Sequence, residues 1–170
     1  IGREVAAARG RNPWPLDATL AEVRGSVRSF ADKEVAPQAE HIHRHDELVP
    51  DRFIESMAEL GYFGLSIPEQ YGGHELGNLA MILTTEELSR ASLASAGSLI
   101  TRPEILAKAL LAGGTDAQKQ HWLPRIGSGE LMVAISVTEP NIGSDVASVA
   151  CRAEPATRDG GAGYVINGAK

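Results

Sequence analysis

Apolar side chains recur at three- and four-residue spacing over most of the first 130 residues, and this is the period of an amphipathic helix. Asp17 is a candidate helix cap, and the pattern predicts a helix from there to about Ala36, where Pro37 kinks or ends it. The expected apolar stripe comprises Leu20, Val23, Val27, Phe30 and Ala31, and the expected water-facing side comprises Glu22, Arg24, Arg28 and Lys33.

Further helical segments follow the same period. A second helix is expected after Pro50, with Gly61 in the position of a glycine that ends a helix. The stretch that follows, "GYFGLSIPEQYGG", predicts an apolar loop packed against neighbouring helices. The remaining helices are expected over residues 79–96, over 103–112 with Pro103 in the first turn, and over 116–126 with Thr115 or Asp116 as the cap.

After Leu131 the period changes from that of a helix to that of a strand. Strands are expected in "LMVAISVT", "VASVACRAE" and "GYVINGAK". The sequence therefore predicts an α+β chain, in which an all-α N-terminal helical domain precedes the first strands of a β domain. The expected limits are a linker or extension over 1–16, the helical domain over 17–130 and the incomplete β domain over 131–170.

Composition narrows the classes of protein that fit. The net charge is -6 and the 16 basic residues are scattered, so the chain lacks the basic stripe that nucleic-acid binding requires. The single cysteine gives no internal disulfide and favours a reducing cytoplasm. No apolar run approaches the roughly 20 residues of a membrane helix, and the N-terminus lacks the apolar region of a signal peptide. The start at Ile1 and the end at Lys170 suggest a piece of a longer polypeptide.

The candidate chemistry lies in "VTEPNIGSD", residues 137–145, which interrupts the strand pattern. Gly143 frees the backbone from side-chain contacts, Ser144 adds a hydroxyl group, and successive turn amides could cradle a phosphate. Thr138 precedes the turn, where its hydroxyl could bind the ring of a larger cofactor. The alternative is an ordinary connection between two strands.

The same stretch resembles the flavin-binding signature of the acyl-CoA dehydrogenase family. Other stretches resemble that family in the same order: "FADKEVAP" at 30–37, "MAELGYFGLSIPEQYGG" at 57–73, "GGTDAQKQHWLPRIGSGE" at 113–130 and "YVINGAK" at 164–170. The resemblance covers about residues 17–170.

The resemblance implies a fold and a reaction. Family members have an N-terminal helical domain, a β-barrel-like middle domain and a C-terminal helical bundle, and they bind FAD between the last two. The implied reaction is α,β-desaturation of an acyl-CoA thioester: a carboxylate removes the α-proton and flavin N5 accepts the β-hydride. An electron-transfer flavoprotein is the implied electron acceptor, and a homo-oligomer is the implied assembly of the full-length protein.

The resemblance also implies cofactor-binding residues, because in the family the segment matching Ile135–Ser144 lines the flavin. Ile135 and Ser136 belong to that segment, and Val137 and Thr138 would bond the pyrimidine side of the ring. Gly143 and Ser144 would lie near the pyrophosphate and the CoA arm, so Ser144 is also a candidate substrate contact.

Glu139 attracts attention as a possible catalytic base because it lies inside the signature. Its position before Pro140 predicts an extended backbone at a strand end. In the family the base belongs to the C-terminal domain, so Glu139 is expected to be structural and the base to lie beyond Lys170.

Arg102 is a second candidate substrate contact. With Thr101 it is expected to begin a helix, at a position that in the family lies near the far end of the acyl pocket. A buried arginine there could receive a carboxylate on the acyl chain; the alternative is an exposed charge before Pro103. The sequence resembles some methylsuccinyl-CoA dehydrogenases, which favours a short, branched, dicarboxylic acyl group.

The remaining conspicuous side chains are expected to have structural roles. His41, His43 and His45 lie at two-residue spacing, but a helical period would spread them around the helix, so no metal site is expected. Cys151 is expected to pack on an alternating strand. Trp14 and Trp122 are expected to be packing anchors.

Two other functions fit the same residues. One is flavin oxidase or monooxygenase chemistry on the same scaffold, because a fold does not fix a function. The other is a non-catalytic helical fragment that serves only as an interaction partner.

Overall fold

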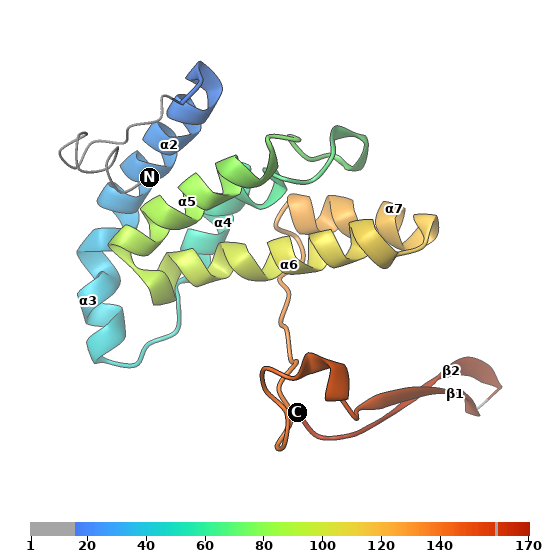
Figure 1. Cartoon of the computed structure of the whole chain (residues 1–170). Coiled ribbons are helices and arrows are strands. Elements are labelled where there is room, and N and C mark those ends of the chain that lie inside the picture. Colours follow the sequence, from blue (N-terminus) through green and yellow to red (C-terminus); the bar gives the residue numbers. More distant parts are fainter. Residues whose placement is uncertain (1–15, 159) are drawn as a thin grey trace, which may run out of the picture. The chain divides into compact units, whose positions relative to one another are not determined.

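A computed structural model describes residues 16–158 and 160–170 (Figure 1). The described residues divide into two compact units, one that ends at Val133 and one that begins at Ala134, which we call the helical unit and the strand unit. The order of helices first and strands last is the order that the sequence predicts. All but the last residue of the expected extension over 1–16, including Trp14, lies outside the described residues.

The first helices of the helical unit form one nearly continuous rod. It consists of α2 (Ala18–Phe30), a π-helical turn (Ala31–Val35) and α3 (Ala36–Arg44). Asp17 caps α2 by accepting a hydrogen bond from the Leu20 amide at 2.8 Å, as predicted. Pro37 does not end the helix, because the wider π turn before it accommodates a residue that has no N–H to donate.

The next segments follow the predicted pattern closely. Helix α4 (Asp51–Glu59) ends before Gly61, which has the left-handed φ of +73° expected of a terminating glycine. The apolar loop after it contains 3₁₀ turns at Tyr62–Gly64 and Glu69–Tyr71. Its large side chains are buried, as predicted: Tyr62, Phe63, Leu65, Ile67 and Tyr71.

Two predictions about the central helices are wrong. Helix α5 (Gly77–Ala91) does not run on to residue 96, because the extended backbone of Ser92 separates it from a π turn at Leu93–Gly97. Helix α6 (Ser98–Gly113) begins five residues earlier than expected, so Pro103 lies inside it and not in its first turn. Thr115 then caps α7 (Asp116–Gly127) through a capping box with Gln118.

The helical unit has two apolar clusters. The larger one joins α2, α3, α4 and α5 to the loop after α4, with Phe53, Met57 and Leu88 among its fully buried members. The smaller one joins the loop to α6 and α7 through Ile67, Leu123 and Ile126. Each such side chain stabilises the fold by roughly 1.5–3 kcal/mol.

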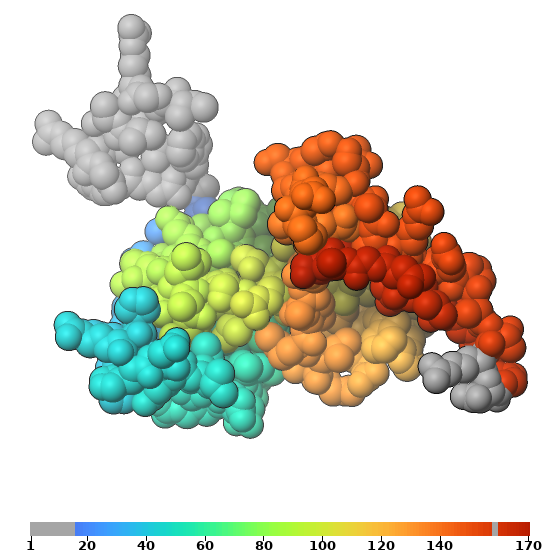
Figure 2. Space-filling view, turned by 90° about the horizontal axis from the view of Figure 1, so that it is seen from below, coloured from blue at the N-terminus to red at the C-terminus, as the bar shows by residue number. Residues whose placement is uncertain are grey.

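The strand unit is less regular than the sequence predicts. Strands β1 (Arg152–Arg158) and β2 (Gly161–Asn167) form an antiparallel pair in which Arg152 lies opposite Asn167. Residues 131–138 form no strand, and Val146–Ser148 form a 3₁₀ turn where a strand was expected. Cys151 lies just before β1, not on it. The residues of β2 are all exposed. In Figure 2 they belong to the red part of the surface, near the C-terminal end of the colour bar.

Candidate functional site

The segment Ile135–Ser144 contains a tight reversal of the chain. The Glu139 amide donates to the Ile142 carbonyl at 3.0 Å, and the Ile142 amide donates back to the Glu139 carbonyl at 3.1 Å. This reciprocal pair closes a two-residue hairpin turn with Pro140 and Asn141 at its tip. The interruption seen in the sequence is therefore a defined hairpin.

The Glu139 side chain is buried at the base of this turn, with 8% of the residue exposed. Its carboxylate accepts hydrogen bonds from the amides of Ala150 and Cys151, both at 2.9 Å, and from Lys170 Nζ at 3.0 Å. These amides, followed by the Lys170 ammonium group, hold the pKa of Glu139 below its usual value. A carboxylate with both oxygens bonded and a lowered pKa is a poor proton acceptor, as expected of a structural residue.

The residues predicted to bind the cofactor lie in one continuous stretch. Ile135, Ser136, Val137 and Thr138 are all exposed, and among the described residues their amides and the Thr138 hydroxyl group make no hydrogen bond. One carbonyl of this stretch does have a partner: the Val137 carbonyl accepts a hydrogen bond from Lys170 Nζ at 2.9 Å. The segment thus presents free polar groups along an open edge.

The residues after the turn are also open. Gly143 and Ser144 are exposed, and within the described part of the chain their amides have no acceptor. A Cβ added to Gly143 would meet no atom within 4 Å. A phosphate could therefore approach these two amides closely, and in this respect the segment fits a dinucleotide such as FAD.

A hollow of about 630 Å³ lies between α5 and α6 in the helical unit. This volume is typical of small-molecule sites. Met81, Ile82 and Ile105 supply much of its apolar wall, and Thr101 also lines it. Arg102 is exposed, is not among the lining residues, and lies inside α6, so the prediction that it begins a helix is wrong.

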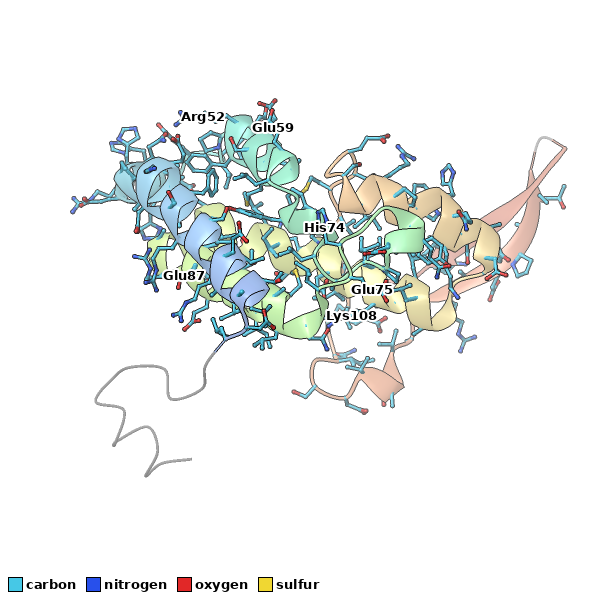
Figure 3. All side chains as sticks on the ribbon, turned by 90° about the horizontal axis from the view of Figure 1, so that it is seen from above. Arg52, Glu59, His74, Glu75, Glu87 and Lys108 are labelled. Carbon is cyan, nitrogen blue, oxygen red and sulfur yellow. The ribbon has the colours of Figure 1, made fainter. Side chains whose placement is uncertain are left out.

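The hollow also contains an ion pair that the sequence analysis missed. Lys108 Nζ lies 2.9 Å from Glu104 Oε1, and Ser66 donates a hydrogen bond to the other oxygen of Glu104. Figure 3 labels Lys108 in this region of the helical unit. The spacing of Glu104 and Lys108 is a signal for a helical pair, but Ser66 comes from a distant loop.

A second buried carboxylate, Glu87, was also missed. It is 1% exposed and is bound by Arg24, Arg28 and Arg90. The prediction that Arg24 and Arg28 face water is confirmed only in part: their side chains are 28% and 51% exposed, but both guanidinium groups also bind Glu87 on α5. Figure 3 shows Glu87 where α2 and α5 meet.

The other conspicuous residues occupy ordinary positions. The rings of His41 and His45 are tilted by 34° with centroids 4.2 Å apart, so two of the three histidines lie together at the end of α3. In the described chain no three His, Cys, Asp or Glu side chains gather as metal ligands would. Trp122 packs against the smaller apolar cluster, as predicted, with the Arg125 guanidinium 5.5 Å from its ring centroid. Every helix within residues 16–158 and 160–170 is too short or too polar to span a lipid bilayer.

The fold is of the α+β class: an all-α unit is followed by a strand unit that contains this hairpin turn. Residues 17–130 match the sequence model of the acyl-CoA dehydrogenase N-terminal domain. The chain therefore belongs to the acyl-CoA dehydrogenase family.

Known proteins of this family are similar over nearly all of the chain. It is 46% identical to (2S)-methylsuccinyl-CoA dehydrogenase of Cereibacter sphaeroides over 99% of its length, which is 29% of that relative. It is 40% identical to mitochondrial 2-methylacyl-CoA dehydrogenase of Solanum tuberosum over 91% of its length and 37% of the relative's. Among solved structures, a glutaryl-CoA dehydrogenase bound to glutaryl-CoA matches with a TM-score of 0.78 and 31% identity, over 91% of this chain and 39% of the other. The chain thus spans less than two fifths of each of these proteins.

Proposed function

We propose that this chain is the N-terminal portion of an FAD-dependent acyl-CoA dehydrogenase. The observation that carries the proposal is the pair of exposed stretches 135–138 and 143–144, whose amides make no hydrogen bond to another described residue, in a chain of this family. In this proposal residues 17–130 form the helical domain and residues 131–170 begin the β-barrel-like middle domain.

Bound FAD would supply a hydride acceptor for α,β-desaturation of an acyl-CoA thioester. Val137 and Thr138 would bind the pyrimidine side of its ring, with Ile135 and Ser136 beside them. The exposed amides of Gly143 and Ser144 would bind its phosphates, and Ser144 would also contact the CoA arm. By the family resemblance, the carboxylate that removes the α-proton would belong to the C-terminal domain. Glu139 is not assigned this role, because its carboxylate accepts hydrogen bonds from the amides of Ala150 and Cys151.

The proposed substrate is a short, branched acyl-CoA. The names of two relatives, (2S)-methylsuccinyl-CoA and 2-methylacyl-CoA dehydrogenase, both specify a methyl-branched acyl group. The apolar hollow between α5 and α6 would suit such a group, and Thr101 lies on its wall. Arg102 remains a candidate partner for a carboxylate on the acyl chain.

Other features of the proposal follow from the family resemblance. An electron-transfer flavoprotein would accept the electrons, and the full-length protein would be a homo-oligomer. The cytoplasmic location stays a prediction from the cysteine content of the sequence.

The absorption spectrum of the purified full polypeptide tests the proposal directly. A flavin spectrum that bleaches anaerobically on addition of a branched acyl-CoA is expected. A folded polypeptide without flavin, or flavin that no acyl-CoA reduces, would contradict the proposal. Rapid reoxidation of the reduced flavin by oxygen would instead favour an oxidase or monooxygenase. The isolated 170-residue chain is expected to bind little FAD.

A further inference from the structure

Two charged residues, Glu139 and Lys170, connect three separate segments of the strand unit. Lys170 Nζ lies 2.9 Å from the Val137 carbonyl and 3.0 Å from Glu139 Oε1. The same carboxylate accepts hydrogen bonds from the amides of Ala150 and Cys151. The hairpin turn is thereby tied both to the start of β1 and to the segment after β2.

The connection is sheltered from water. The Glu139 side chain is 7% exposed and the Lys170 side chain is 26% exposed, so their pairing is screened less than that of a surface ion pair. Because the carboxylate accepts two amides and an ammonium group, it has few ways to move. The backbone of Glu139 is also fixed, through its two hydrogen bonds to Ile142.

We infer that Glu139 and Lys170 are positioning residues that hold Val137–Ser144 in the conformation that binds the flavin. This inference rests on the proposed function. The bond from Lys170 fixes the direction of the Val137 carbonyl, and Thr138 is held between that bond and the hairpin. Groups fixed before binding lose less conformational entropy when the ligand arrives.

The two charges differ in their expected effect on the flavin. Removal of either partner loosens the segment, so FAD affinity falls in both cases. Removal of the Glu139 charge leaves the Lys170 ammonium uncompensated, and a cation nearby stabilises the reduced, more negative flavin. Removal of the Lys170 charge leaves a carboxylate that does the opposite. The reduction potential of the flavin therefore moves in opposite directions, whereas the FAD affinity falls in both variants.

The test uses Glu139→Gln, Lys170→Met, the double variant and Lys170→Arg in the full polypeptide. Glu154→Gln is the matched control, because Glu154 is an exposed carboxylate on β1 of the same unit. The measurements are FAD affinity of the apoprotein by fluorescence quenching, the reduction potential of the bound flavin, and thermal melting of the apoprotein.

We expect FAD affinity to fall on the order of tenfold in each single variant, and by much less than the product of the two losses in the double variant. The potential should rise in Glu139→Gln and fall in Lys170→Met. Lys170→Arg should restore most of the affinity, and Glu154→Gln should resemble the wild type.

Affinities of both single variants within about twofold of wild type would overturn the inference. So would losses that parallel the melting temperature with no opposite shift in potential. A wild-type polypeptide that binds no FAD would instead overturn the proposed function, and this inference with it.

Discussion

Arg28 donates two hydrogen bonds to the Glu87 carboxylate, from Nε to Oε2 at 2.9 Å and from Nη2 to Oε1 at 2.6 Å. Arg24 Nε adds a contact at 2.8 Å and Arg90 Nε one at 3.2 Å. Since Glu87 belongs to α5 and two of the arginines belong to α2, these bonds attach the first helix to the centre of the helical unit. The Arg28 hydrogen bond, opposed by burial and assisted by Arg24 and Arg90, lowers the pKa of Glu87 to about 2.

This lowered pKa predicts a loss of stability in acid. The folded state holds the carboxylate charged, so its contribution is complete above the ordinary pKa of 4.5 and disappears as the pH falls toward 2. The full contribution is about 3 kcal/mol. Urea unfolding between pH 7 and pH 2.5 should show this fall in the wild type.

Glu87→Gln is expected to remove that part of the pH dependence and to be less stable than the wild type at pH 7. The matched control is Glu22→Gln, an exposed carboxylate on α2, which should leave the pH profile unchanged. An unchanged profile in Glu87→Gln would show that another group is responsible.

Gly73 and Gly72 are expected to resist replacement for different reasons. A Cβ on Gly73 would lie 2.0 Å from the backbone oxygen of Ile67, so the loop must shift to accept alanine. Gly73→Ala should therefore cost at least about 2 kcal/mol of unfolding free energy. Gly72 has open space but a φ of +80°, so Gly72→Ala should cost only about 1 kcal/mol. Chemical denaturation measures both values, and a smaller loss at Gly73 than at Gly72 would contradict the contact argument.

Thr115 is expected to contribute about 1 kcal/mol as the cap of α7. Its hydroxyl group accepts the Gln118 amide at 3.2 Å, and the Gln118 side chain accepts the Thr115 amide at 2.9 Å. Thr115→Ala removes one half of this capping box. Thr19→Ala, at an exposed position within α2, is the control and should change the stability by less than about 0.5 kcal/mol. Equal effects of the two substitutions would assign the loss to the threonine side chain in general and not to the cap.

Local signals account for the parts of the fold that the sequence predicts well. The Asp17 and Thr115 caps and the Gly61 terminator act through hydrogen bonds or backbone angles within a few residues. The predicted start of α6 at Pro103 was wrong. Proline favours the first turn of a helix, but the longer helix α6 tolerates the one backbone N–H donor that Pro103 lacks. The expected strand over 131–138 failed for another reason: a strand requires a partner, and none of the described residues pairs with that segment.

The candidate site shows the same division between local and distant information. The turn within Ile135–Ser144 could be predicted because its proline, glycine and serine lie close together in the sequence, whereas the cofactor-binding role of the segment stays a prediction. The partners of Glu139 could not, because Ala150, Cys151 and Lys170 are 11, 12 and 31 residues away. Two of the arginines around Glu87 are 59 and 63 residues away. A buried carboxylate requires a partner, but the sequence of α5, where Glu86 and Glu87 are adjacent, shows neither which one is buried nor what binds it.

Arg102 provides the last prediction, which concerns the acyl group. If its guanidinium group binds a carboxylate on the substrate, Arg102→Ala in the full polypeptide should lower kcat/KM for a carboxylated short-chain acyl-CoA by roughly 10- to 100-fold. A plain acyl-CoA of equal length should be much less affected, because it has no carboxylate to lose. Arg102→Lys should recover only part of the loss, since lysine cannot bind a carboxylate through two nitrogens.

The Arg102→Ala experiment needs a control arginine whose removal should not change the preference between the two acyl-CoA substrates. Arg44 is suitable because its side chain is 71% exposed on α3 and pairs with Glu40 at the surface. Arg44→Ala should leave the ratio of the two kcat/KM values unchanged. Equal losses on both substrates in Arg102→Ala would exclude the carboxylate role, and the exposed position of Arg102 would then reflect an ordinary surface charge.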